Sequence, residues 1–405
     1  MRKHQLIALI LFYLFLYCGQ AMAGQITFVI TGLPDYHNSN DSIYLAGTIN
    51  GWTTANPHFK FKTNSQGQLS LTVPMKNVGD KLQFKLTRGT WETVELDAQR
   101  YDKGNRTYTY RGGRYQELIS IAHWKDKVSS KGLKSTIAGD VRIFTDKLKY
   151  QGEYRTIRVL LPSDYQHAQN STRRYSVLYM FDGQNLFDKA TASVGMEWRI
   201  DELLTELSKK KSSNSVIVVG IDSLTVCDRF NEYTGWQWQA KDCGTVKGEG
   251  AFMSAFVVNQ VKPFIDETFR TQKDRQSTYI GGSSLGGYMA IYTGIHYQYT
   301  FSKVLGLSNA VLDKYTGDRL RERILALKMQ QPIDFYLDIG SQEAVSQSNR
   351  SDLLIDSNQK MAEAIRQAGF DANSVTFKVI EGGVHDENSW SERFVEVLEQ
   401  LKIIK

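Results

Sequence analysis

A short turn rich in glycine and serine, residues 281–287, constrains this chain more than any other stretch. Residues 277–280 read as a strand, and a helical pattern follows the turn. Between them lies Gly282-x-Ser284-x-Gly286. A strand can reverse directly into a helix only where the residues that flank the bend carry no bulk. The pattern therefore predicts a strained turn that holds the Ser284 hydroxyl exposed at the carboxyl end of the strand.

The order of residues along the chain limits which histidine can act as the base for Ser284. A serine hydroxyl needs a base, the base needs an orienting carboxylate, and after such a turn the order is serine, acid, histidine. Only two of the seven histidines follow Ser284. His296 lies in the helix that the turn opens and is carried away from the serine. The expected base is therefore His385, in a glycine-rich loop directly after the last apolar run.

The acid is expected in the loop after the preceding apolar run, residues 333–339. Glu343 stands past the end of that run and is the first choice, while Asp338 and Asp352 stay open as alternatives. A carboxylate at this place would hold the imidazole in orientation and stabilise its protonated form.

Two backbone N–H groups are expected to stabilise the oxyanion of an acyl-transfer reaction. Leu285 follows the serine in the first turn of the helix, where free N–H groups point outward. Gln184 lies in the loop 180–187, in which Gly183 lets the backbone approach closely. Such a site needs no metal and no cofactor, and we expect neither, because the sequence has no H-E-x-x-H and no paired-cysteine metal motif.

The chain from Val141 onward has the pattern of an α/β fold. Two extended runs, 141–144 and 155–161, suggest an opening antiparallel hairpin, and apolar runs then alternate with helical stretches. This alternation predicts a mostly parallel sheet with helices on both faces and a site at the carboxyl ends of its strands. A helix near 253–265 is expected to kink at Pro263. The expected strands are 175–181, 215–221, 277–280, 303–307, 333–339 and 375–380.

Residues 24–124 show a different pattern, with apolar residues at every second position of short runs. Turn-forming pairs such as Asn50-Gly51 separate these runs. The pattern predicts a small all-β domain, an immunoglobulin-like sandwich. A linker over 125–140, rich in Lys, Ser and Gly, is expected to join it to the second domain, 141–405.

Three stretches of the first domain, 43–52, 84–91 and 105–107, resemble a starch- or glycogen-binding module. Flat aromatic rings suit stacking against a pyranose, and Lys and Asn suit hydrogen bonds to its hydroxyls. The resemblance implies a polysaccharide site lined by Trp52, Lys85, Trp91 and Asn105.

The second domain resembles the esterase-D-like "putative esterase" family of the α/β-hydrolases. That family includes feruloyl and acetylxylan esterases and enterobactin-type siderophore esterases. The resemblance implies a serine esterase with Ser284 as nucleophile, Glu343 as acid and His385 as base. An aromatic insert over 234–248 departs from the family, so the substrate is not carried over. The matching stretches are 179–187, 219–222, 229–233, 262–266, 282–287 and 383–390.

Four side chains are expected to contact the substrate: Trp236, Trp238, Trp390 and Arg229. The aromatic insert and the sugar-module resemblance favour acyl esters of glycans, such as acetyl or feruloyl esters. A siderophore trilactone is the alternative, and a basic pocket built by Arg229 and Lys241 would favour it. A catalytically inactive carbohydrate-binding protein is a further alternative.

Residues 1–23 have the pattern of a secretory signal peptide, so we expect a periplasmic or secreted protein without a membrane anchor in the mature chain. Cleavage removes Arg2 and Lys3 from 49 basic residues and leaves 47 against 43 acidic residues. That small excess points to neither nucleic acid nor a membrane surface. Cys227 and Cys243 then remain, and in an exported protein we expect them to form one disulfide, worth about 3 kcal/mol.

Overall fold

The computed structural model of the chain describes residues 24–127, 133–193, 195–210, 215–240, 243–311, 316–343 and 350–404. Its contacts divide the chain into two compact units, and the division falls between Ser129 and Ser130. This boundary falls inside the expected linker, and the expected signal peptide lies outside the described residues. Over the described ranges, no helix is long and apolar enough to cross a membrane.

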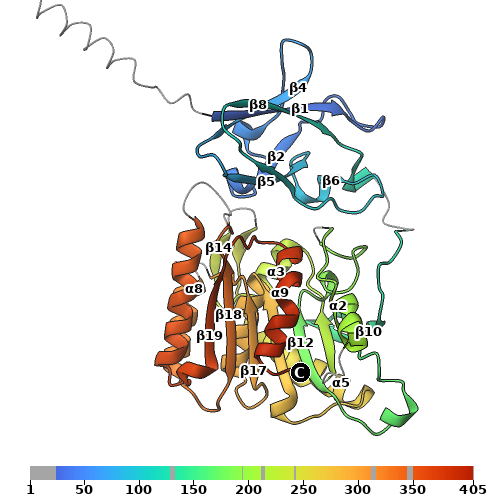
Figure 1. Ribbon diagram of the computed structural model, residues 1–405, viewed down its shortest axis with the longest axis vertical. Helices are drawn as coiled ribbons and strands as arrows, with labels where there is room; N and C mark the ends of the chain where they lie inside the picture. The colour runs from blue at the N-terminus through green and yellow to red at the C-terminus, as the bar shows by residue number, and fades with distance from the viewer. Residues whose placement is uncertain are drawn as a thin grey trace, which may run out of the picture. The chain divides into compact units, whose positions relative to one another are not determined.

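The N-terminal unit is all-β, as the alternating pattern predicted (Figure 1). One sheet has the order β3-β4-β1-β8 and a second has the order β2-β5-β7, while β6 pairs with β9. Inward-facing residues such as Phe28 and Phe84, with ring centroids 4.7 Å apart, build the core between the strands. The bounds are β1 Gly24–Gly32, β2 Tyr44–Gly47, β3 Lys62–Thr63, β4 Leu69–Met75, β5 Lys81–Thr87, β6 Glu95–Leu96, β7 Arg106–Thr109, β8 Arg114–Ser120 and β9 His123–Trp124.

The C-terminal unit is built on an eight-stranded sheet with the order β10-β11-β13-β12-β16-β17-β18-β19. The strands β10 and β11 form the expected antiparallel hairpin, and β11 also runs antiparallel to β13. All other neighbouring pairs are parallel. The bounds are β10 Asp140–Tyr150, β11 Glu153–Leu161, β12 Ser176–Phe181, β13 Val216–Ile221, β16 Thr278–Ser283, β17 Lys303–Leu307, β18 Asp334–Gly340 and β19 Val375–Ile380.

Helices cover both faces of this sheet. Alternate residues of its buried strands therefore point into two separate cores, one on each face. Tyr179 of β12 joins the core beneath α6 and α8, whereas Met180 joins the core beneath α2 and α9. The α/β expectation is therefore confirmed. The helices are α2 Ile200–Lys210, α3 Val226–Glu232, α4 Gly250–Phe256, α5 Lys262–Thr268, α6 Leu285–His296, α7 Asp318–Leu327, α8 Arg350–Gln367 and α9 Glu387–Gln400.

The expected kink near Pro263 takes the form of a π-helical turn, Val257–Val261, between α4 and α5. Pro263 itself lies in the first turn of α5. A proline has no N–H to donate, and the wider turn before it absorbs the disturbance of the hydrogen-bond ladder.

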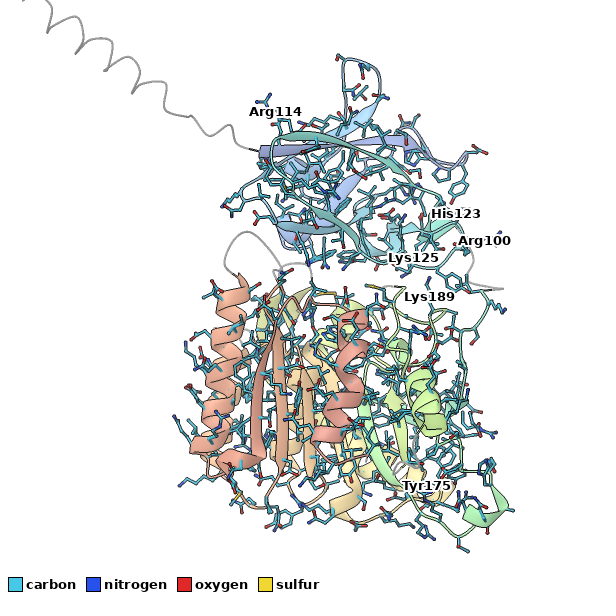
Figure 2. All side chains as sticks on the ribbon, viewed as in Figure 1. Arg100, Arg114, His123, Lys125, Tyr175 and Lys189 are labelled. Carbon is cyan, nitrogen blue, oxygen red and sulfur yellow. A yellow bond between two sulfur atoms is a disulfide. The ribbon has the colours of Figure 1, made fainter. Side chains whose placement is uncertain are left out.

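The parallel strands all point toward one end of the C-terminal unit. In Figure 2, Tyr175 marks the entry into β12, and Lys189 lies beyond the carboxyl end of that strand. A small two-stranded sheet, β14 Trp238–Ala240 and β15 Gly244–Val246, belongs to the insert between α3 and α4. The loops at the carboxyl end carry all three residues expected to do chemistry.

Candidate active site

The turn between β16 and α6 has the strained geometry that the glycine pattern predicted. Ser284 stands between the two elements with φ 55° and ψ −127°. A side chain at Gly282 would place its Cβ 2.6 Å from the backbone carbon of Gly286, so no side chain fits there. The end of β17 and the loop after it hold the turn: Ser284 N–H donates to Leu307 O at 2.9 Å, and Ala310 N–H donates to Ser284 O at 3.0 Å.

Three side chains from three loops meet at this turn in one hydrogen-bonded chain. His385, in the loop between β19 and α9, lies with Nε2 2.8 Å from the Oγ of Ser284. Its Nδ1 lies 2.7 Å from Oε2 of Glu343, which follows β18. This order leaves one consistent neutral tautomer, in which Nδ1–H donates to the carboxylate and Nε2 accepts from the serine hydroxyl.

The two other carboxylates considered for the acid lie elsewhere. Asp338 is inside β18 and is fully buried, with its oxygens bound to Arg393, Tyr336 and the N–H of Ser308. Asp352 is exposed on α8. Of the three candidates, Glu343 is the one whose oxygen meets the imidazole.

Charge and burial have opposite effects on the pKa of His385 and on the pKa of Glu343. Burial by itself would lower the pKa of His385, but the charge and hydrogen bond of Glu343 outweigh it and raise that pKa above its usual value. Burial would likewise raise the pKa of Glu343, which is 1% exposed, yet His385, Ser308 and the Gly340 N–H together hold it below its usual value. The geometry thus keeps the carboxylate ionised beside the imidazole.

The two backbone N–H groups expected to bind an oxyanion lie in two neighbouring loops. Leu285 begins α6, and Gln184 lies in the short turn Gly183–Asn185 after β12. In the part of the chain that the structure describes, neither N–H has a protein acceptor. The two loops touch, because a Cβ at Gly286 would lie 2.9 Å from Oδ2 of Asp182. Both N–H groups are therefore available to an oxyanion.

The Gln184 loop is held by its own side chain. The Gln184 amide donates to Ser223 Oγ at 2.8 Å and to Ser193 Oγ at 3.2 Å, and its oxygen accepts from Ser223 N–H at 2.9 Å. These bonds pin the turn to the loop after β13, which limits how far the Gln184 N–H can move.

Arg229 lies beside this loop in an ion pair. Its Nε and Nη2 each lie 2.7 Å from an oxygen of Asp182, in a bidentate arrangement. Glu387, the first residue of α9, is buried nearby and accepts from Asn185 Nδ2 at 3.2 Å. Burial raises the pKa of Glu387 to about 7. Sequence reasoning missed Asp182 and Glu387, although both stand in stretches that carried the family resemblance.

The comparisons with known proteins agree with this geometry. The profile of the family described as "Putative esterase" matches residues 149–401, which is more than half of the chain. The chain belongs to this esterase family. Its fold and family make it a carboxylic-ester hydrolase.

Curated relatives of this esterase match different shares of its length. An "Acetyl esterase" of Caldicellulosiruptor saccharolyticus is 25% identical over 274 residues, 61% of this chain and 92% of that protein. An uncharacterized protein of Bacillus subtilis, YbbA, is 22% identical over 252 residues with the same two coverages, 61% and 92%. An "Alpha-amylase" of Niallia circulans is 34% identical over 109 residues, 27% of this chain but only 8% of the amylase.

Solved structures share the fold of this esterase. The enterobactin esterase FES from Shigella flexneri, in the presence of enterobactin, has a TM-score of 0.58 at 12% identity over 93% of both chains. The BES protein from Bacillus cereus has a TM-score of 0.50 at 18% identity, over 66% of this chain and 96% of its own. At such identities these likenesses concern the fold.

The three tryptophans expected to contact substrate each pack against another ring of the esterase. Trp390, on α9, is buried; its ring stands edge-on to His385 with centroids 5.2 Å apart, and its Nε1 donates to Ser308 Oγ at 2.8 Å. The expectation that Trp390 contacts substrate is wrong, because the side chain is buried and packs against His385. Trp236 stands edge-on to Tyr292 of α6 at 5.7 Å, and Trp238 lies 5.6 Å from the ring of Phe230. These contacts hold the insert on α6 and α3.

The disulfide expected from the cysteine count is present between Cys227 and Cys243. It ties α3 to the turn of the insert. The described residues contain no group of three or more His, Cys, Asp or Glu that could hold a metal ion. Lys241, considered for a basic pocket, lies outside the described residues.

In the N-terminal unit, the two tryptophans of the expected sugar site lie side by side. The rings of Trp52 and Trp91 are 6.3 Å apart at 38°, and both side chains are half-buried. Asn105 is also half-buried, in the loop before β7. The expectation that Lys85 lines the sugar site is wrong, because Lys85 is 2% exposed and forms an ion pair with Asp102. Its ammonium group is turned into the unit and away from any ligand on the surface.

Proposed function

We propose that this esterase is an exported serine hydrolase that cleaves neutral acyl esters, such as acetyl or feruloyl esters of glycans, through Ser284, His385 and Glu343. One observation carries the proposal: the hydrogen-bonded chain from Ser284 Oγ through both nitrogens of His385 to Glu343, with steps of 2.8 and 2.7 Å. Such a chain lets a serine hydroxyl lose its proton as it attacks.

In the first half of the reaction, Ser284 Oγ attacks the ester carbonyl while its proton passes to Nε2 of His385. The imidazolium that forms is stabilised by the buried carboxylate of Glu343. The carbonyl oxygen becomes negative and is held by the N–H groups of Leu285 and Gln184. His385 then gives its proton to the leaving alkoxide, which departs as an alcohol and leaves an acyl group on Ser284.

In the second half, water replaces the alcohol. His385 takes a proton from the water, the resulting hydroxide attacks the acyl carbonyl, and the same two N–H groups hold the oxyanion. Collapse of this intermediate returns the proton to Ser284 Oγ and releases the carboxylic acid. Every proton lost by one group is taken up by another, and no metal or cofactor takes part.

The charges near Ser284 favour a neutral substrate. The cation Arg229 is matched by Asp182 in a bidentate pair, and the second buried carboxyl, Glu387, lies within electrostatic range of both Asp182 and His385. Together with Glu343, the described charges acting on His385 leave no excess of positive charge. An anionic substrate would gain little here, whereas the hydroxyls of a glycan could bond to such groups.

The test is turnover of p-nitrophenyl esters from acetate to octanoate by the wild type and by Ser284→Ala. We expect Ser284→Ala to lose turnover, and the chain-length optimum to report the depth of the acyl pocket. Labelling of Ser284 by a phosphonate probe tests the catalytically inactive alternative, because an inactive site would stay unlabelled. Activity of Ser284→Ala equal to that of the wild type would refute the proposed nucleophile.

A siderophore trilactone is the competing substrate, and the likeness to FES over 93% of both chains is the observation that favours it. The two substrate classes separate in one experiment: the wild type is given acetylated xylan, a feruloylated oligosaccharide and enterobactin at equal concentration. Faster release from the glycan esters supports the proposal. A preference for enterobactin by more than about 10-fold, which corresponds to 1.4 kcal/mol, would replace it.

We propose a second function for the N-terminal unit, binding of an α-glucan through Trp52 and Trp91. The side-by-side indoles and the 34% identity to an alpha-amylase over 109 residues support it. The test is binding of maltoheptaose to the whole chain, with Trp52→Ala and Trp91→Ala beside it and Tyr115→Ala as a control on an exposed aromatic. Binding lost only in the two tryptophan variants supports the site, and no binding by the wild type would dismiss it.

Export is part of the proposal, since the first 23 residues have a signal-peptide pattern and the mature chain carries a disulfide. Fractionation of cells that express the whole chain tests it. A processed chain beginning near Gly24 in the periplasm or medium is expected, and an unprocessed cytoplasmic chain would contradict it.

A further inference from the structure

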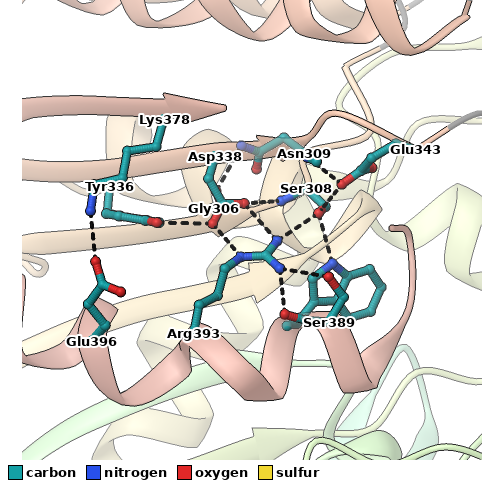
Figure 3. A network of polar contacts seen from close by, with 12 residues as sticks. Gly306, Ser308, Asn309, Tyr336, Asp338, Glu343, Lys378, Ser389, Arg393 and Glu396 are labelled. Carbon is teal, nitrogen blue, oxygen red and sulfur yellow. Dashed lines mark hydrogen bonds and ion pairs between the residues drawn. The ribbon is translucent and has the colours of Figure 1, made fainter. Parts of the chain in front are cut away.

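Ser308 occupies an unusual position directly after β17. It is fully buried, and its φ is 46°, in the left-handed region that a residue with a side chain seldom adopts. Its N–H donates to Oδ1 of Asp338 at 2.8 Å, which holds the backbone in this conformation. Figure 3 shows its hydroxyl at the centre of a polar network that joins β17, β18 and α9. Backbone strain of this kind is concentrated at functional sites, where the surrounding structure holds the residue in its unfavourable conformation.

The orientation of the Ser308 O–H bond follows from the hydrogen-bond donors that surround its Oγ. Its Oγ receives the Nε1–H of Trp390 at 2.8 Å and the Nη2–H of Arg393 at 3.0 Å. Indole and guanidinium nitrogens can only donate, so both lone pairs of the hydroxyl are used. The single hydrogen of Ser308 must therefore point to its remaining partner, Oε1 of Glu343.

The two oxygens of Glu343 thereby have separate tasks. Oε1 accepts from the Ser308 hydroxyl and from the Gly340 N–H at 2.8 Å. Oε2 is left to Nδ1 of His385, 2.7 Å away. A carboxylate on a glutamate side chain can rotate about its last bond, and two donors on one oxygen stop that rotation.

The far side of the network is a buried ion pair. Arg393 donates to Asp338 through Nε at 2.7 Å and through Nη2 at 3.0 Å, and its Nη1 donates to Ser389 O at 2.6 Å. Asp338 also accepts from Tyr336 at 3.1 Å. Because the pair is fixed from several elements, the Nη2–H that reaches Ser308 has little freedom to move.

We propose that Ser308 is a positioning residue of this esterase, which orients Glu343 for His385 and connects the acid to the anchored Asp338–Arg393 pair. The inference rests on the proposed roles of Glu343 and His385. It adds that the same loop serves two members of the triad. Leu307 O and Ala310 N–H clamp the backbone of Ser284, while the hydroxyl between them holds the acid.

The test uses two substitutions of Ser308 that affect the backbone differently. Ser308→Ala and Ser308→Gly both delete the hydroxyl, but glycine is relaxed at φ 46° and alanine is not. We expect both variants to lose kcat on p-nitrophenyl acetate by about 10- to 100-fold with little change in KM, as a misplaced catalytic group does. We expect thermal stability to be lower for alanine than for glycine, so that stability and activity do not follow each other.

A matched control lies at the other end of the same strand. Ser302 directly precedes β17, is buried, and donates its hydroxyl to Gln276 O at 3.1 Å. Ser302→Ala should lower stability through a lost buried hydrogen bond and leave kcat unchanged. A spectroscopic readout adds to this: the downfield proton resonance of His385 Nδ1–H should move upfield in both Ser308 variants and stay in place in Ser302→Ala.

The outcomes separate this inference from the proposed function. If Ser284→Ala keeps wild-type activity, the proposed triad fails, and the role of Ser308 fails with it. If Ser284→Ala is inactive but Ser308→Gly has wild-type kcat and an unmoved His385 resonance, the triad stands and the positioning role is overturned. If Ser308→Gly recovers the activity that Ser308→Ala loses, the effect is backbone strain, and the role of the hydroxyl is again refuted.

Discussion

At the scale of single residues, two strained serines define the site. Ser284 and Ser308 both have positive φ, and each directly follows one of two neighbouring parallel strands, β16 and β17. The hydroxyl of the first bonds to His385, where we propose that it attacks the substrate, and the hydroxyl of the second bonds to Glu343, the proposed acid. A regular backbone at either place would aim these side chains elsewhere, so the strain is part of the geometry of the site.

Glu343→Gln tests the acid. A glutamine can keep the shape but cannot accept Nδ1–H with a full negative charge, and it favours the wrong imidazole tautomer. We expect kcat on p-nitrophenyl acetate to fall by about 10⁴-fold, the effect known for the equivalent change in a serine protease, with KM nearly unchanged. The control is Glu381→Gln, an exposed glutamate before His385. Equal loss in both variants would argue against a specific role for Glu343.

The pH dependence of activity follows from His385. In the proposed mechanism the neutral imidazole accepts the serine proton, so we expect kcat/KM to rise as the pH increases through the pKa of His385. Burial lowers that pKa and Glu343 raises it by more, so the net pKa lies above 6.5. We expect the half-maximal point of the acid limb above pH 6.5, measured with p-nitrophenyl acetate between pH 5 and 9. A midpoint below 6.5 would mean that burial outweighs Glu343.

Glu387→Gln should stabilise the esterase in alkaline solution. Burial raises the pKa of Glu387 to about 7, so the folded state keeps a proton that the unfolded state loses above its ordinary pKa. Stability from this group is complete in acid and declines until the pH passes about 7. Glutamine avoids this loss, worth roughly 3 kcal/mol. Chemical unfolding at pH 4 and pH 8 measures it; the variant should gain only at pH 8.

At the scale of elements, α3 links the disulfide to the reaction centre. Cys227 lies on α3 together with Arg229, which pairs with Asp182, and Tyr233 directly follows the helix and receives the Asp182 N–H at 3.2 Å. Asp182 immediately precedes the Gln184 turn. A loose α3 would therefore loosen the loop that carries Gln184, one of the two proposed oxyanion donors.

Replacement of both cysteines by serine should show this coupling. The crosslink spans 16 positions along the sequence and is worth about 3 kcal/mol by its effect on the unfolded chain. We expect a lower melting temperature and a lower kcat for the double variant, with Ser284 still labelled by the phosphonate probe. A variant that melts lower but keeps wild-type kcat would confine the disulfide to a stabilising role.

At the scale of the whole molecule, two units each have a core of their own. The core of the first lies within residues 26–124, and the two cores of the second lie within residues 150–404. Among the described residues, each of the three core clusters lies within one unit. Separate cores of this size are what independently folding domains possess.

A chain that begins at residue 130 should therefore fold and hydrolyse p-nitrophenyl acetate with about the same kcat/KM as the whole chain. Circular dichroism and thermal melting check the folding, and the whole chain with Ser284→Ala gives the inactive baseline. Binding of maltoheptaose, if present in the whole chain, should be absent from the shortened one. A shortened chain that folds but is inactive would make the N-terminal unit part of the esterase.

The amino-acid pattern determined the arrangement of strands and helices and the order of the candidate site residues along the chain. Strands β17 and β19 match the expected runs to the residue. Strand β10 extends six residues past its expected end at Phe144, and the other strands of this sheet differ from expectation by one to three positions at an end. The Gly282-x-Ser284-x-Gly286 turn and the glycine-rich loop around His385 could be recognised in the sequence, because a serine-hydrolase site needs particular residue types at short spacings. The Cys227–Cys243 pair followed from counting.

Only the tertiary structure decided what each polar or aromatic residue does. Whether Asp338 or Glu343 meets His385 depends on which loop reaches the imidazole, and the two carboxylates are five positions apart in the same stretch of sequence. Trp390 and Lys85 have the side chains of binding residues, yet packing buried both. Ser308 carries no motif at all. Local pattern encodes the period and the turns, whereas contacts between residues of different strands and loops depend on how the strands assemble, so these roles could not be read from the sequence.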